Sequence, residues 1–457
     1  MGFLQPSDRK CRRSPRSLLL PDNHGSDFDK LDPQEDRLNG GASYWSAVFN
    51  LSTTIIGAGI MALPATLKQL GLIPGLIMIV LGAILTSFSI ETILKFSRAS
   101  KSATYSGLAA DAFGVSGKNL LQVCVVLNNL GLLVVYMIII GDVLSGTRRE
   151  KVHHSGLIEE WMGQHWLTSR AFLMLCTTLF VFAPLISLRR VDSLRYTSAV
   201  SVGLAIVFVA ITAGIATVKL VNGTIEMPHL VPKLDGMSAF WRLFTTMPVL
   251  VTAYICHHNI HPIENELAEP GQMKSIVRTS LMLCVSVYMA TSLFGFLLFG
   301  EDTMDDILAN FDGDLRIPYS SDLNDLVRAS YGIHLMLVFP IVFFSLRLNL
   351  DGLLCPHSVA IVYDNRRFYF LTASLMGLIF LGANFVPSIW DVFEFTGATA
   401  AVSIGFIFPA AVVLRDSHGV ATKKDKVISL VMIMFSVTSS LVAISSEMDS
   451  LLSSEPS

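Results

Sequence analysis

The segment YWSAVFNLSTTIIGAGIMALPATLKQLG, residues 44–71, decides how the chain folds. It is apolar over a length that can cross a bilayer, yet Gly57, Gly59 and Pro64 interrupt it. Glycine weakens a helix, and proline removes a hydrogen-bond donor and clashes with the preceding turn. A helix broken inside a membrane persists only where its freed backbone groups are buried in protein or line a cavity. The segment therefore predicts either a broken helix whose amides bind an anion or a glycine face packed against another helix.

The composition of the whole chain places this segment in a membrane protein. Hydrophobic residues make up 52% and charged residues 15% of the 457 residues, whereas soluble domains carry about 25% charged residues. Each apolar stretch must satisfy its own backbone hydrogen bonds in lipid, so each should be helical. We predict an all-α polytopic membrane protein with eleven transmembrane helices. They cover residues 46–66, 72–96, 120–145, 171–187, 196–220, 243–263, 277–299, 327–350, 368–388, 390–414 and 427–446.

The two ends of the chain are polar. Residues 1–45 are basic and then acidic, lack the apolar core of a signal peptide and predict a disordered tail. Lysine and arginine concentrate in the loops on the same side as this tail, which makes that side cytoplasmic. The apolar transmembrane domain then spans residues 46–446, and residues 447–457 form a short non-cytoplasmic tail.

The net charge argues against a nucleic-acid partner, and the positions of the cysteines argue against a disulfide-stabilised scaffold. The formal net charge of −3 gives no basic surface for a nucleic acid. No two of the six cysteines share an exposed loop, so we expect no disulfide framework.

A second apolar segment is interrupted in the same manner as the first. FTTMPVLVTAYICHHNIHPIENEL, residues 244–267, carries Pro248 and Pro262 around the polar Thr252 and Tyr254. Paired interruptions in corresponding segments of two halves indicate the binding site of a secondary transporter. Spans one to five and six to ten would form the two halves.

The same segment contains a histidine cluster. His257 and His261 lie four residues apart, on one face of a helix, and two imidazoles at that spacing can supply half of a zinc site. The motif H-E-x-x-H is absent, however, and no other loop adds a Cys/His cluster. We expect no metal and a structural role for the histidines, with His258, Glu264 and Glu266 exposed to water.

Three motifs carry a resemblance to a known family. Residues 47–71 resemble the first helix of the amino acid/auxin permease superfamily, in its sodium-coupled neutral amino acid transporter branch, with the pattern F-N-L-S-x-x-I-x-G-x-G-I-L-x-L. PVLVTAYICHHNIHPIENEL resembles the sixth helix, where C-H-x-x-x-x-P-I-x-x-E-L recurs, and FEFTGATAAVSIGFIFPA resembles the tenth. The motifs occur in the family's order, and the chain is most similar to plant vacuolar-type amino acid transporters.

The resemblance implies a leucine-transporter-type fold, with five-plus-five inverted repeats, broken helices one and six, and one extra helix. It also implies the positions that meet the substrate. The α-carboxylate would bind amides near Gly57, Ala58, Gly59 and Ile60, and the α-amino group would bind carbonyls near Thr252, Ala253 and Tyr254. Both assignments agree with the electrostatics of helix ends.

The chain differs from the sodium-coupled branch at the residues that would bind the coupling ion. Thr53 replaces that branch's asparagine, and Asp351 aligns with its partner threonine. Thr53 and Asp351 could still hold sodium, but a carboxylate at membrane depth is also a proton carrier because burial favours its neutral form. An ion pair with Arg347, four residues before Asp351, would instead hold the carboxylate ionised. We favour proton coupling over sodium coupling.

The predicted function is secondary active transport of amino acids by alternating access. The transporter would act as a monomer in a lipid bilayer, without cofactors, in the vacuolar membrane or else the plasma membrane. Two rival hypotheses are an amino acid-sensing receptor that signals through the N-terminal tail and a metal-dependent membrane enzyme built on the cluster from His257 to Glu266.

Overall fold

The apolar spans are helical, as predicted. A computed structural model describes residues 41–453 except 150–151, 226, 234–236, 314, 316, 386–391 and 393–395. Within these residues, eight helices are long and apolar enough to cross a membrane, and the bent pair α2 (Tyr44–Ile55) and α3 (Gly59–Leu70) makes a ninth span. The predicted fourth span is divided among three consecutive short helices, and the predicted sixth is divided in two.

The elements of the bundle follow the chain in order. The remaining helices of the spans are α4 (Leu72–Ser100), α5 (Tyr105–Ser145), α7 (Arg170–Thr177), η2 (Thr178–Phe182), α8 (Ala183–Ile186), α9 (Arg195–Val221), α10 (Met237–Ala253), η4 (His257–Asn259), α11 (Ile260–Glu266), α12 (Met273–Phe299), α13 (Ser320–Leu354), α14 (Asn365–Phe385), η9 (Gly397–Ala401), η10 (Ser403–Ile407), α16 (Phe408–Arg415) and α17 (Lys423–Ser453). The connecting segments contain β1 (Thr147–Arg149), β2 (Val152–His154), α6 (Leu157–Met162), η1 (Trp166–Thr168), η3 (Asp192–Leu194), η5 (Pro270–Gln272), η6 (Gly300–Asp302), η7 (Ile307–Asp312) and η8 (Ile361–Tyr363).

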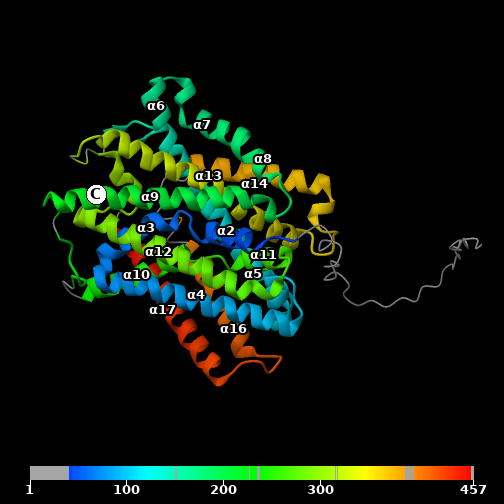
Figure 1. Cartoon of the computed structure of the whole chain (residues 1–457). Coiled ribbons are helices and arrows are strands. Elements are labelled where there is room, and N and C mark those ends of the chain that lie inside the picture. Colours follow the sequence, from blue (N-terminus) through cyan, green and yellow to red (C-terminus); the bar gives the residue numbers. More distant parts are fainter. Residues whose placement is uncertain are drawn as a thin grey trace, which may run out of the picture.

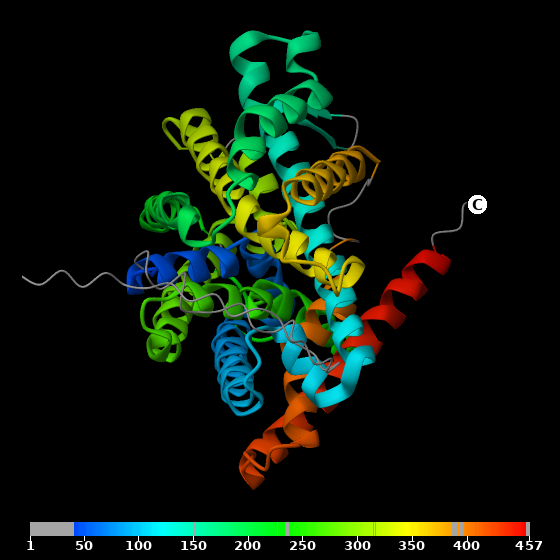
Figure 2. The same ribbon diagram turned by 90° about the vertical axis from the view of Figure 1, so that its right-hand side faces the viewer.

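The two broken spans lie in the middle of the bundle. Figure 1 shows α9, α12 and α4 running side by side, and Figure 2 shows several long helices end-on around the dark-blue α2 and α3. α12 packs against α2, α3 and α9, while α13 packs against α5 and α9. The last helix, α17 (red), lies at the periphery, where most of its apolar window is not buried by other helices. Spans one and six are therefore enclosed by other helices, which is the condition for broken helices in lipid.

The described residues reach into both predicted tails. Residues 1–40 lie outside the described residues, but Ala42 already bridges to Leu267 and the Ser43 hydroxyl caps the helix that starts at Tyr44. At the other end, α17 continues to Ser453, beyond the predicted boundary at residue 446.

One small sheet occurs outside the spans. β1 and β2 form an antiparallel hairpin, the only two strands in the described part of the chain.

Candidate functional site

Span one breaks at the glycine pair. α2 ends at Ile55, α3 begins at Gly59, and the two helices are bent by 54°. Ile56 is extended, with φ −76° and ψ 95°, so the helical hydrogen-bond ladder stops there. Among the described residues, no backbone carbonyl accepts a hydrogen bond from the amides of Gly57, Ala58 or Gly59. These three amides lie at the positive, N-terminal end of α3, where the helix dipole favours an anion.

Proline does not cause this break. Pro64 lies inside α3 without ending it, just as Pro248 lies inside α10. Span six breaks between its two prolines: α10 ends at Ala253, and Tyr254, Ile255 and Cys256 connect it to η4.

The two breaks are in direct contact. A Cβ on Gly59 would lie 2.8 Å from the Ala253 Cα, so only glycine lets the start of α3 approach the end of α10 this closely. Both positions are buried, and Ile60 beside them has 0% exposure. Of the candidate substrate-binding residues at the break in span one, Gly59 thus lies directly against Ala253.

Tyr288 of α12 connects the carbonyl ends of both broken helices. Its hydroxyl lies 2.6 Å from the carbonyl oxygen of Ile55 and 2.6 Å from that of Ala253. One hydroxyl has a single proton, so it cannot fully satisfy two buried carbonyls. An ammonium group, with three donors, matches this pair of acceptors better.

Two further tyrosines complete the enclosure of the break. The Tyr331 hydroxyl donates to the Gly57 carbonyl at 3.1 Å. A Cβ on Gly57 would lie 2.1 Å from the Tyr136 hydroxyl oxygen, and that hydroxyl also faces the Ala58 amide. Tyr136, Tyr288 and Tyr331 were not predicted from the sequence. The sequence feature that could have identified them is a polar hydroxyl group inside an apolar span, because polar groups at membrane depth often have a functional role.

The side chains of Thr252 and Tyr254 are engaged elsewhere. The Thr252 hydroxyl donates to the Pro248 carbonyl at 2.8 Å, and the Tyr254 hydroxyl donates to the Ile79 carbonyl of α4 at 3.0 Å. Only the backbone of this segment is therefore available to a ligand at the junction of the breaks.

The two predicted coupling residues lie in different surroundings. The buried Thr53 hydroxyl donates to the Ser198 carbonyl of α9 at 3.0 Å. Asp351, near the end of α13, pairs with Arg367 of α14, with 2.9 Å between Oδ1 and Nε. No hydrogen bond or ion pair joins Thr53 to Asp351 in the described part of the chain.

The hypothesis of an Arg347–Asp351 pair is wrong. The Arg347 guanidinium donates to the carbonyls of Ile186 and Leu188 and lies 4.0 Å from the centre of the Phe368 ring. The guanidinium also donates to the Thr372 hydroxyl at 3.0 Å. These three acceptors and the Phe368 ring hold Arg347 away from Asp351, which pairs instead with Arg367 of the next helix.

The histidine cluster packs span six against α4. The His257 Nε2 lies 3.0 Å from the Ser89 hydroxyl, and the His261 Nε2 lies 2.8 Å from the Ser97 hydroxyl. The described residues contain no group of three or more potential metal ligands. The expectation that His258 is exposed to water is wrong: its exposure is 4%, because η4 lies inside the bundle.

Glu266 is also engaged rather than free in water. Its carboxylate accepts hydrogen bonds from the amides of Val191 and Asp192, at 2.9 and 2.7 Å. Asp192 in turn accepts a hydrogen bond from the Ser46 hydroxyl, and the Ala42 amide donates to the Glu266 carbonyl. The start of span one, the end of span six and the segment before α9 are thereby tied together.

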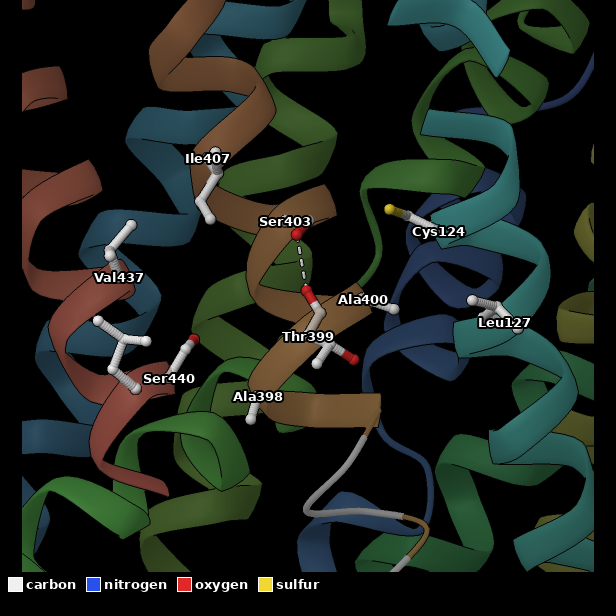
Figure 3. A pocket seen from close by; sticks show the side chains of 10 residues that line it. Cys124, Leu127, Ala398, Thr399, Ala400, Ser403, Ile407, Val437 and Ser440 are labelled. Carbon is white, nitrogen blue, oxygen red and sulfur yellow. Dashed lines mark hydrogen bonds between the residues drawn. The ribbon is translucent and has the colours of Figure 1, made fainter. Parts of the chain in front are cut away.

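A shallow groove of about 250 Å³ lies between α5, the η9–η10 segment and α17. Figure 3 shows its lining, with Cys124 and Leu127 on one wall and Val437 and Ser440 on the other. The Ser403 hydroxyl donates to the Thr399 carbonyl, as the dashed line shows. The groove is mostly apolar and lined by none of the residues at the two breaks, so it is not the candidate site.

A family model described as transmembrane amino acid transporter protein matches residues 40–448. The chain belongs to this transporter family. The resemblance predicted from the three motifs is therefore confirmed, and the chain is an integral multi-pass membrane protein of a family of transporters rather than of enzymes.

Relatives of this transporter cover nearly its whole length. Amino acid transporter AVT6A of Arabidopsis thaliana is 56% identical over 451 residues, which are 98% of this chain and 97% of the relative. Sodium-coupled neutral amino acid symporter 2 of Danio rerio is 26% identical and covers 93% of this chain and 86% of its own. A crystal structure of the Eremococcus coleocola manganese transporter matches with a TM-score of 0.60 at 11% identity, over 94% of this chain and 90% of that one. This last similarity shows the fold alone.

Proposed function

We propose that this transporter carries amino acids, and that the junction of the two breaks binds the zwitterion. The observation that carries the proposal is the pair of carbonyls, Ile55 and Ala253, that share one tyrosine hydroxyl beside three amides that donate to no backbone carbonyl in the described residues. Carbonyl ends attract the ammonium group, and the amides before α3 attract the carboxylate. Every amino acid has both groups, so this arrangement recognises the class and leaves side-chain selectivity to other residues.

We further propose alternating access on an eleven-span architecture of two inverted five-helix repeats plus α17, acting as a monomer. The ties among Ser46, Asp192 and Glu266 would form the cytoplasmic closure. They join both broken spans to the segment before α9, so they must separate when the site opens to the cytoplasm. Such clusters break and re-form between discrete packed states.

Uptake into proteoliposomes tests the function directly. Purified protein should accumulate amino acids saturably, and the accumulation should follow an imposed proton gradient rather than a sodium gradient. A matched preparation of the Gly57→Val variant supplies the background. Binding of amino acids without turnover would contradict the transport function and favour the receptor hypothesis instead.

Proton coupling is the proposed mode, with Asp351 as a titrating group at the cytoplasmic end of α13. Asp351 and Arg367 keep only 10% and 15% of their side chains exposed, so gain or loss of a proton at Asp351 changes a shielded ion pair. The alternative, sodium, would use the Thr53 hydroxyl with the carbonyls at the end of α2.

The variant Asp351→Asn tests this assignment. We expect uptake driven by a pH gradient to fall to the rate measured without a gradient, because the amide cannot exchange a proton. Asp425→Asn is the matched control, since Asp425 forms a 2.9 Å pair with Lys95 that is more exposed. Asp351→Asn uptake that keeps its full dependence on the pH gradient would remove Asp351 from the coupling mechanism.

We propose that the transporter resides in the vacuolar membrane, with the plasma membrane as the alternative. A fluorescent fusion viewed beside markers of both membranes distinguishes them.

A further inference from the structure

The groove between α5, the η9–η10 segment and α17 adjoins surface that the bundle leaves uncovered. Leu127 on its α5 wall is 50% exposed, and Val437 and Leu441 on its α17 wall are 42% and 61% exposed. Both walls belong to membrane spans, so the apolar surface left open by the described residues faces hydrocarbon. Figure 3 shows the two walls on either side of the η9–η10 segment, which forms the floor of the groove.

The chemistry of the lining favours an uncharged, apolar occupant. No charged or aromatic side chain is among the described residues that line the groove. The Ser403 hydroxyl donates to the Thr399 carbonyl, and of the buried hydroxyls in the lining only that of Ser440 lacks a partner in the described part of the chain. A bound water needs two to four polar partners, and apolar cavities stay dry. A charged ligand would be buried without a partner, whereas a flexible hydrocarbon chain gains dispersion contacts with such a lining.

The floor of the groove also contacts the break in span six. A Cβ on Gly397 of η9 would lie 2.7 Å from the Thr252 Oγ1, and one on Gly405 of η10 would lie 3.4 Å from the Ile255 Cδ1. Thr252 lies just before the end of α10, and Ile255 lies inside the break. The same stretch of span ten therefore packs against both sides of the end of α10 and forms the floor of the groove.

Span ten is wound more widely than an α-helix along this stretch. The Val402 amide donates to the Gly397 carbonyl, and the Phe408 amide donates to the Ser403 carbonyl, in each case five residues earlier. Such π-helical turns are rare and occur frequently at functional sites. This π-helical stretch thus lies between the break in span six and the groove, so whatever fills the groove packs directly against it.

We infer that the groove holds an acyl chain of a membrane lipid, and that this chain supports span ten where it packs against the break in span six. An empty groove would deprive its lining atoms of dispersion contacts, and the adjacent bilayer supplies chains that restore them. When the break rearranges during transport, span ten must repack against the chain. The effect on uptake rests on the proposed transport function, whereas binding of the chain does not.

Photolabelling in vesicles tests the occupant. The probe is a phosphatidylcholine with a diazirine at the middle of one acyl chain, mixed into unlabelled phosphatidylcholine, and mass spectrometry locates the labelled residues. We expect Thr399 and Ser403 on the floor to be labelled in the unmodified protein. The variant Val437→Trp fills the groove from the α17 wall, where the exposure of Val437 leaves room for the ring, and should reduce this labelling to the level measured without light.

Val431→Trp is the matched control, because Val431 is exposed on the same helix but does not line the groove. It should keep the labelling of Thr399 and Ser403. If Val437→Trp does not fold, Leu127→Trp fills the groove from the α5 wall and should remove the same label.

Several results would overturn the assignment to an acyl chain. Equal labelling of the floor in the unmodified protein and in a folded groove-filling variant would show that the chain does not enter the groove. Displacement of the label by an added sterol would assign the groove to a sterol. Efficient disulfide formation between two copies of a Leu441→Cys variant would show that a second copy of the chain covers it.

Uptake measurements test the link to transport. Initial rates in vesicles whose phosphatidylcholine chains carry one or several double bonds should differ for the unmodified protein and for Val431→Trp. The difference should disappear in Val437→Trp, and its persistence there would overturn the link between the chain and span ten. Absence of amino acid uptake in the unmodified protein would overturn the proposed function itself, while photolabelling would still identify the occupant.

Discussion

Replacement of Gly57 by valine is expected to abolish saturable amino acid uptake while the protein still reaches the membrane. The new Cβ would lie 2.1 Å from the Tyr136 hydroxyl oxygen, inside van der Waals contact, and Tyr136 is only 2% exposed. The side chain therefore fills the space in front of the Ala58 amide, where the carboxylate is proposed to bind. The measurement is initial uptake rate against amino acid concentration in proteoliposomes, beside size-exclusion chromatography of the purified variant.

Gly203→Val is the matched control for this experiment. Gly203 lies on the exposed side of α9, and a Cβ there meets nothing within 4 Å. The same substitution in a span should therefore leave uptake unchanged. Normal uptake by Gly57→Val would exclude the break in span one as the substrate site.

The second large effect is expected from Tyr288→Phe, which removes the hydroxyl shared by the carbonyls of Ile55 and Ala253. Leaving a buried acceptor unsatisfied costs about 1–3 kcal/mol, so the substrate-free variant should melt at a lower temperature. Saturating amino acid should restore more stability to the variant than to the unmodified protein, because the ammonium group replaces the lost donor. Thermal unfolding with and without substrate measures both effects.

Tyr44→Phe is the control for Tyr288→Phe. The Tyr44 hydroxyl also faces α12, but its partners are the hydroxyls of Ser275 and Thr279 rather than backbone carbonyls. This variant should show no extra stabilisation by substrate. Equal substrate stabilisation in Tyr288→Phe and the unmodified protein would place the ammonium group elsewhere.

The sequence was sufficient to predict an all-helical, multi-span chain and the presence of two breaks. Apolar length and the absence of charge follow directly from the bilayer, and the glycines at 57 and 59 mark the break of span one. The prolines did not mark where the helices break. Pro64, Pro248 and Pro340 all lie inside continuous helices, because a membrane helix tolerates the loss of one hydrogen bond when neighbours satisfy the freed carbonyl.

The three tyrosines could not be assigned to the site from the sequence alone. Tyr288 meets Ile55 across 233 residues, and Tyr331 meets Gly57 across 274. Spacing rules within one helix say nothing about such contacts. The same limitation explains Asp351: the four-residue spacing favoured Arg347, but packing turned Arg347 toward Phe368 and brought Arg367 to the carboxylate.

A cryo-electron microscopy map of the transporter with a bound amino acid tests the central claim most directly. The account predicts that the α-carboxylate lies within hydrogen-bond distance of the amides of Gly57, Ala58 and Gly59. The α-ammonium group should contact the carbonyls of Ile55 and Ala253. An amino acid bound away from these groups, or spans one and six continuous through residues 56–58 and 254–256, would contradict it.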